Sequence, residues 1–273
     1  MRVHVVVVGD TTPMPRTPDG VRRVDATDVG RLTMDIPDDG MPVIVLAELR
    51  HAGAAGREAA LLAQRTGVPG VARRMLPHGP LALHHLAVAL AAAVAARDLG
   101  AAVAVELLDR LAAATLSAAW LASVSALDDP PPSVSQHVRS LRPGGAGFVV
   151  THAPDQAVHA VRSLPAAMGP SATTGPTRRV LLVSGQAPAA TVAKIARLAG
   201  ALEVRPVDPE ITLRTRYGTS RGAELAALPD DVAALLPAEA SLVPCPTCAL
   251  RLAREICPFC HTSRQPVLVG GSQ

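Results

Sequence analysis

Four cysteines near the end of the chain carry the clearest chemistry in the sequence. They are the only cysteines among the 273 residues and form two Cys-Pro-x-Cys pairs, Cys245 with Cys248 and Cys257 with Cys260. Two residues between cysteines let both thiolates of a pair face one ion, and two such pairs supply four sulfur ligands to a closed tetrahedral site. The spacing therefore predicts one structural Zn²⁺ ion. An iron site of the rubredoxin kind, which uses the same ligands, stays open as an alternative.

The cysteine segment resembles a known kind of small module. Residues 244–266 are similar to the short zinc-ribbon families, including the double-zinc-ribbon type with repeated Cys-Pro-x-Cys knuckles. In those families a glycine often follows the second cysteine of a knuckle, whereas this chain has Ala249 and His261 at those positions. The resemblance implies a metal-held ribbon at the C-terminus and covers about a tenth of the chain. The body of the chain resembles no family on these grounds.

Polar residues at the ends of predicted strands are the candidates for ligand binding. Asp10 and His51 follow the first two predicted strands, and His152 and Asp155 follow a later one. In an open parallel sheet, ligands bind outside the carboxyl ends of the strands. One hypothesis is a crevice in which His152 acts as a base oriented by Asp155. The alternative is that polar residues simply begin where strands leave the core, with Asp155 capping a helix.

The glycine-rich motifs of nucleotide-binding enzymes are missing from the sequence. It contains no Gly-x-x-x-x-Gly-Lys-Ser/Thr phosphate loop, and the glycine after the first strand lacks the further glycines of a dinucleotide fingerprint. We therefore assign no catalytic residue. The sequence favours a non-enzymatic protein without excluding an enzyme.

Arginines in two segments are candidates for phosphate or nucleic-acid contact. They are Arg214, Arg216 and Arg221 in one loop and Arg251 and Arg254 in the cysteine module. Such residues neutralise phosphates in nucleic-acid complexes. Against this, the 26 basic and 23 acidic residues are scattered, and the net charge is only +3. A solvated loop is the alternative interpretation.

The remaining sequence predicts alternating strands and helices. Strands are predicted at Val3–Val8, Val43–Leu46, Gly147–Val150, Val180–Val183 and Leu202–Val204, and helices at Ala54–Thr66, Leu81–Leu99, Ala102–Leu127, Gln156–Leu164, Pro188–Leu198 and Ala223–Leu236. The two long Ala-rich helices form a hairpin joined at Gly100. Charged residues such as Arg97 and Asp98 interrupt its apolar runs, so we expect a buried hairpin and no membrane span.

These elements predict an α/β fold with a largely parallel sheet, a long Ala-rich helical hairpin and a C-terminal zinc ribbon. The predicted segments are residues 1–129 with the hairpin, residues 130–240 with a βαβαβ order, and residues 241–273 with the ribbon. The sequence leaves open whether the first two segments share one sheet.

The function predicted on these grounds is that of a non-enzymatic adaptor or structural component of a macromolecular assembly, with the ribbon contacting a protein partner. One alternative is a small-molecule enzyme or ligand-binding protein that uses the strand ends. Another is a nucleic-acid binder that uses the ribbon and the Arg214–Arg221 loop. The N-terminus has no signal-peptide pattern and the cysteines occur only in metal-type pairs, so a cytoplasmic location is expected.

Overall fold

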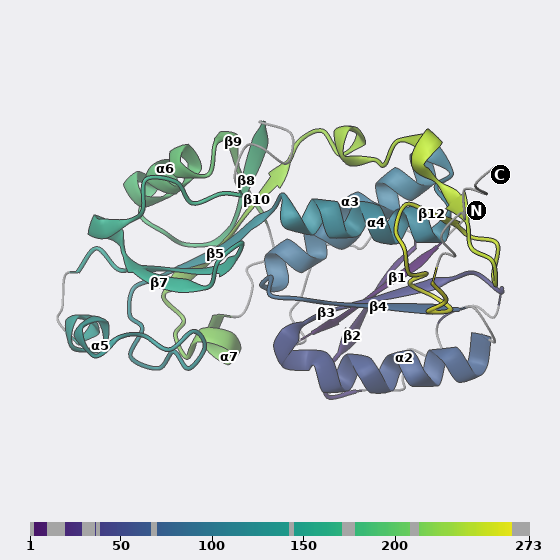
Figure 1. The fold of residues 1–273 in the computed structure, drawn as a ribbon. Helices are drawn as coiled ribbons and strands as arrows, with labels where there is room; N and C mark the ends of the chain where they lie inside the picture. The colour runs from purple at the N-terminus through teal and green to yellow at the C-terminus, as the bar shows by residue number, and fades with distance from the viewer. Residues whose placement is uncertain are drawn as a thin grey trace, which may run out of the picture.

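Two β-sheets lie side by side, and the helix Pro80–Arg97 packs between them (Figure 1). The structure is a computed structural model that describes residues 3–9, 20–28, 36, 39–66, 70–141, 145–170, 178–207 and 213–263. The α/β class predicted from the sequence is confirmed. The strands form two main sheets, and the boundary between them does not follow the predicted segments, because the strand Leu116–Leu121 of the first segment lies in the sheet of the second.

The first sheet is entirely parallel. Its strands are β1 (His4–Gly9), β2 (Val21–Asp25), β3 (Val43–Glu48) and β4 (Val71–Leu76), in the order β2-β1-β3-β4. Continuous Val and Ile runs form β1 and β3 because both faces of a parallel sheet are covered, which removes the polar alternation. Helix α2 (Ala52–Thr66) packs on one face, while α3 (Pro80–Arg97) and α4 (Ala101–Ala113) cover the other.

Helix α3 is apolar around most of its circumference because it contacts both sheets. It packs against β1 and β3 of the first sheet and against β5 and β10 of the second. Leu86 and Leu90 are fully buried in this position. By length and composition alone α3 could cross a membrane, but half of it is buried inside the protein. Helices α3 and α4 form the predicted hairpin.

The second sheet is mixed. Its strands are β5 (Leu116–Leu121), β6 (Phe148–Ala153), β7 (Ala157–Ala160), β8 (Arg179–Gly185), β9 (Ala201–Pro206) and β10 (Gly222–Pro229), in the order β7-β6-β5-β10-β8-β9. Only β8 and β9 are parallel, joined by α6 (Ala189–Leu198) as predicted. The expected βαβαβ order is wrong for the rest, because β5 and β10 lie between β6 and β8.

Three predicted helices differ from the structure. The second half of Ala102–Leu127 contains strand β5, and the first half of Ala223–Leu236 lies in strand β10. Residues Gln156–Leu164 contain strand β7 followed by the 3-10 helix Val161–Ser163. The physical reason is the same for β5 and β10. Both are central strands buried on both faces, so their Ala and Leu runs show no period of two and look helical.

Short elements complete the described chain. They are α5 (Val134–Ser140), α7 (Leu213–Tyr217), the 3-10 helices Leu49–His51, Ala233–Leu235 and Glu239–Ser241, and the strand pair β11 (Val243–Pro244) and β12 (Arg251–Leu252). The pair β11–β12 belongs to the cysteine module, which packs on α4 (Figure 1). Leu252, Cys257 and Phe259 are buried in the same core cluster as the helical hairpin.

Candidate ligand-binding site

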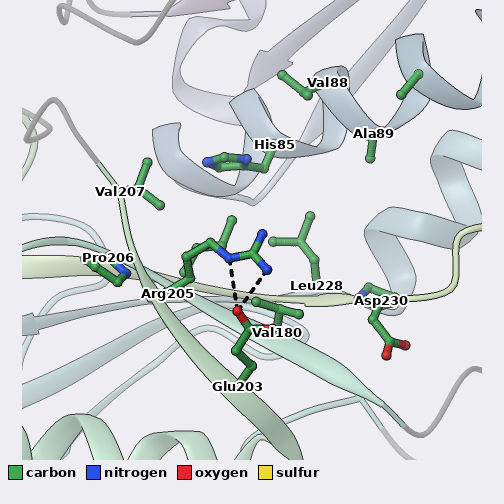
Figure 2. Close-up of a pocket in the computed structure, with 13 residues that line it drawn as sticks. His85, Val88, Ala89, Val180, Glu203, Arg205, Pro206, Val207, Leu228 and Asp230 are labelled. Carbon is green, nitrogen blue, oxygen red and sulfur yellow. Dashed lines mark hydrogen bonds and ion pairs between the residues drawn. The ribbon is translucent and has the colours of Figure 1, made fainter.

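A groove runs between helix α3 and the second sheet (Figure 2). Its volume is about 660 Å³. Its floor and walls are mostly apolar: Val88, Ala89 and Ala92 from α3, and Val180, Leu182 and Leu228 from β8 and β10.

The sequence of β8 and β10 explains why this face is apolar. Alternate residues of a strand point to opposite faces. Leu181, Leu225 and Ala227 pack with α6 on one face, whereas Leu182 and Leu228 belong to the core around α3 on the other. Both faces of this sheet are therefore apolar. The alanines at positions 89 and 92 of α3 are too short to reach the strands fully, which leaves the groove open.

Polar groups lie at the two ends of the groove. At one end His85 of α3 faces Arg205 of β9, whose guanidinium donates to Glu203 Oε1 at 2.8 Å and 3.1 Å (Figure 2). The Nε2 atom of His85 is buried and has no hydrogen-bond partner within the described residues. Burial, together with the charge of Arg205, lowers the pKa of His85 to about 4, so the ring is neutral at pH 7. Asp230, just beyond β10, lines the opposite end.

The groove continues along α3 beyond Ala92. A second hollow of about 180 Å³ shares Ala89 and Ala92 with it and is closed by Val232, Ala233 and Leu236 from the segment after β10. Within the two hollows, polar side chains lie at the margins and apolar ones in the middle. Such an arrangement suits an elongated apolar molecule with a polar end.

A buried polar cluster joins the carboxyl end of the first sheet to the second sheet. Glu48, the last residue of β3, is 2% exposed. It accepts a hydrogen bond from Arg50 Nε at 2.8 Å and pairs with Arg216 of α7. Arg216 also reaches Nδ1 of His152 in β6, with Nη2 at 3.4 Å. Arg50 and Arg216 thus neutralise the buried charge of Glu48.

The cluster extends from His152 to the first turn of α3. Tyr217 donates from its hydroxyl to Glu224 Oε1 at 2.8 Å, and His152 Nε2 lies 3.0 Å from the same hydroxyl. Because the Tyr217 hydroxyl donates its proton to Glu224, His152 donates from Nε2 to the hydroxyl oxygen and accepts at Nδ1 from Arg216. Burial lowers the pKa of His152 to about 4, which fits this neutral form. Glu224 Oε2 accepts from the Leu81 backbone N–H at 2.8 Å, one of the N–H groups that a helix start leaves unpaired.

This cluster leaves little room for a ligand. The cavity bordered by Glu48, Arg50, His152 and Arg216 measures about 60 Å³, which is room for a few water molecules. Burial raises the pKa of Glu224 and raises that of Tyr217 well above its ordinary value, as expected for groups enclosed by protein. We interpret the cluster as a connection between the two sheets.

Of the four predicted ligand-binding residues, the structure describes three, and it does not pair His152 with Asp155. Asp10 lies outside the described residues, His51 is half-buried in the 3-10 helix after β3, and Asp155 is exposed in the turn after β6. His152 is directed at Tyr217 and Arg216, so Asp155 is not its orienting partner.

Sequence reasoning also missed residues of both sites. Glu224 is a lone acid in the apolar strand GAELAALP, a signal that could have marked it as buried. No comparable signal distinguishes the alanines of α3 that line the groove.

The four cysteines converge as their spacing predicts. Their sulfur atoms all lie within 4.8 Å of one another, with Cys245 Sγ 3.5 Å from Cys260 Sγ and Cys248 Sγ 3.6 Å from Cys257 Sγ. These distances are far longer than a disulfide bond of about 2.05 Å and match the edges of about 3.8 Å of a tetrahedron with metal–sulfur bonds of about 2.3 Å. The set can bind one metal ion.

Both knuckles close in the same way. The backbone N–H of Ala249 donates to Cys245 O at 3.0 Å, and that of His261 to Cys257 O at 3.1 Å. Ala249 and His261 adopt left-handed φ values of 59° and 58°, the conformation that a glycine takes without steric cost. These are the two positions where ribbon families often carry glycine.

The arginines proposed for nucleic-acid contact do not form a free basic face. Arg254 donates to Glu106 at 2.8 Å and to Asp109 at 2.5 Å, both on α4, and Arg251 pairs with Glu239 at 3.1 Å. The guanidinium of Arg216 is buried against Glu48, which leaves Arg214 and Arg221 exposed on the surface. The arginines of the cysteine module attach it to the body of the protein.

Comparison with solved structures identifies the fold. No protein-family model and no curated protein matches the sequence. Structurally, the chain is similar to a DegV family protein from Corynebacterium glutamicum, at 12% identity and a TM-score of 0.57, over 85% of this chain and 98% of that one. It is also similar to a fatty-acid-binding DegV family protein from Thermus thermophilus, at 14% identity and a TM-score of 0.56, over 84% and 100% of the chains.

A third match is the Streptococcus pneumoniae fatty acid kinase B3 protein loaded with linoleic acid, at 11% identity and a TM-score of 0.55, over 85% and 100% of the chains. The body of the chain thus has the fold of DegV family proteins. Two predictions from the sequence are contradicted: the adaptor function, and a protein or nucleic-acid partner. Several of the structural neighbours are instead described as proteins that bind fatty acids. The findings favour the alternative of a ligand-binding protein.

Proposed function

We propose that this protein binds a fatty acid, with the acyl chain in the groove between α3 and the second sheet. The groove itself carries the proposal: it has an apolar floor, small side chains on the helix wall and polar groups at its margins. Its volume of about 660 Å³ falls within the range of about 300–1,000 Å³ of ligand pockets. Fatty-acid binding by proteins of the same fold supports the same ligand class.

The chemistry of the lining argues for an amphiphile over a compact polar metabolite. A polar metabolite would leave Val180, Leu182 and Leu228 in contact with polar atoms and would find few hydrogen-bond partners among them. An acyl chain gains about 0.8 kcal/mol for each methylene group removed from water. An elongated groove offers that gain along its whole length.

The test is a binding titration of the delipidated protein with laurate and palmitate, alongside native mass spectrometry of the protein as purified. The decisive variant is Ala92→Phe, which places a ring in the groove. Displacing about two methylene groups of a bound chain costs about 1.6 kcal/mol and lowers affinity about tenfold or more. The matched control is Ala63→Phe on the exposed side of α2, which should bind like the wild type. Equal affinities in the two variants would refute the groove as the binding site.

We further propose that the metal bound by the four cysteines is a structural Zn²⁺ ion. Four thiolates leave no open position for a substrate, so the ion would stabilise the module without acting on the ligand. Thiolate ligands need a reducing compartment, which supports a cytoplasmic location. Elemental analysis should find one zinc per chain, and stoichiometric iron would overturn the assignment.

A further inference from the structure

The end of the groove at β9 holds two groups that the protein does not use fully. His85 has a buried Nε2 atom without a partner in the described structure. Arg205 donates twice to a single oxygen of Glu203, and the side chains of this pair are 59% and 54% exposed. Both residues line the groove and face each other across it (Figure 2).

We propose that His85 and Arg205 form the carboxylate subsite of the groove, so that the bound fatty acid lies with its head at β9 and its tail along α3 toward Leu236. This inference rests on the proposed function. A carboxylate bound at this end would accept one or two hydrogen bonds from the Arg205 guanidinium. It would accept one more from the neutral imidazole once the His85 ring turns its buried Nε2 atom toward the ligand. The guanidinium is the side chain best suited to planar recognition of a carboxylate.

The cost of releasing Arg205 from Glu203 is small. Ion pairs between exposed side chains contribute about 0–1 kcal/mol because water already solvates both partners. A ligand carboxylate at the mouth of an apolar groove meets less water, so its pairing with Arg205 is stronger. Glu203 is thus a competitor of the ligand head for Arg205.

The charges along the groove set the direction of the ligand. The opposite end carries the carboxylate of Asp230, which repels an anionic head. Beyond Ala92 the second hollow is lined mainly by apolar groups, among them Val232, Ala233 and Leu236. From His85 to Ala93 the helix rises about 12 Å at about 1.5 Å per residue, and this length is available to the tail.

The test compares laurate with dodecanol, two ligands with chains of equal length that differ in the charge of the head. In Arg205→Gln we expect laurate affinity to fall about ten- to a hundredfold, the range for loss of a charged hydrogen bond, while dodecanol affinity stays unchanged. His85→Leu should act in the same direction, and His85→Gln, which keeps an N–H donor, should restore part of the loss. The matched control is Arg162→Gln, which removes an exposed arginine remote from the groove lining.

Glu203→Gln gives the sharpest outcome because it predicts a gain. Freeing Arg205 from its competitor should raise laurate affinity about two- to fivefold, which a purely structural role of the pair would not produce. The subsite is refuted if wild type and all these variants share one ratio of laurate to dodecanol affinity. If instead the wild type binds neither ligand, the proposed function fails together with this inference. If laurate binds in the groove with an affinity that does not change in the Arg205 and Glu203 variants, the inference is overturned and the proposed function stands.

Discussion

Buried histidines should make the stability of this protein fall steeply in mild acid, and His78 and His152 are the most deeply buried of them. His78 and His152 are 3% and 2% exposed, and burial lowers the pKa of each from 6.5 to about 4. In the unfolded chain both take up a proton below pH 6.5, whereas in the folded protein both stay neutral down to about pH 4. Unfolding therefore binds protons in this window, and stability is lost as the pH falls through it.

The magnitude follows from the two pKa values. A tenfold difference in proton affinity corresponds to about 1.4 kcal/mol, so each histidine contributes about 3 kcal/mol that is present above pH 6.5 and gone near pH 4. The slope in between is about 1.4 kcal/mol per pH unit for each histidine. Glu224 has the opposite effect on the pH dependence of stability. Burial raises its pKa, so its contribution to the free energy of unfolding falls as the pH rises. A difference between variants is therefore more informative than the wild-type slope.

The assay is urea unfolding at pH 7, 6 and 5, followed by the fluorescence of Trp120, the only tryptophan in the sequence. His152→Gln keeps an N–H donor for the Tyr217 hydroxyl but cannot titrate. We expect its slope of unfolding free energy against pH to be about 1.4 kcal/mol per unit smaller than that of the wild type. His137→Gln, on the exposed surface of α5, is the control. Identical slopes for His152→Gln and wild type would show that His152 does not stay neutral in the folded protein.

Three further predictions concern the polar cluster and the cysteine module. Tyr217→Phe leaves His152 and Glu224 without a shared partner, and we expect urea unfolding to show a loss of about 2–4 kcal/mol; a loss below roughly 0.5 kcal/mol would contradict the cluster. Ala249→Gly relieves a left-handed backbone and should stabilise the module by about 1 kcal/mol, measured as slower release of metal to a chelator, with faster release as the opposing result. Arg254→Gln should weaken attachment of the module by about 1–2 kcal/mol and increase proteolysis within residues 243–263, whereas unchanged proteolysis would count against attachment through α4.

The polar cluster shows why the sequence could not reveal the sites of the body. Glu224 accepts from Leu81, 143 positions away in the chain, and His152 meets Tyr217 across 65 positions. Each residue taken alone looks like a cap, a loop residue or an isolated acid. Which of these residues come into contact depends on the order of strands in the second sheet. That order could not be predicted, because β5 and β10 were predicted to be helical.

The sequence by itself determined the four-cysteine cluster, because all four cysteines lie within a short stretch and a two-residue spacing closes a knuckle through local backbone geometry alone. It also determined the parallel strands β1 and β3, since an unbroken run of β-branched residues is typical of a strand covered on both faces. Only the tertiary structure decided that the runs at Leu116–Leu121 and Gly222–Pro229 are strands, because Ala and Leu fit either a helix or a strand buried on both faces. It alone created the groove, whose walls come from α3, β8, β9 and β10 and exist only where small side chains on the helix leave apolar strands uncovered.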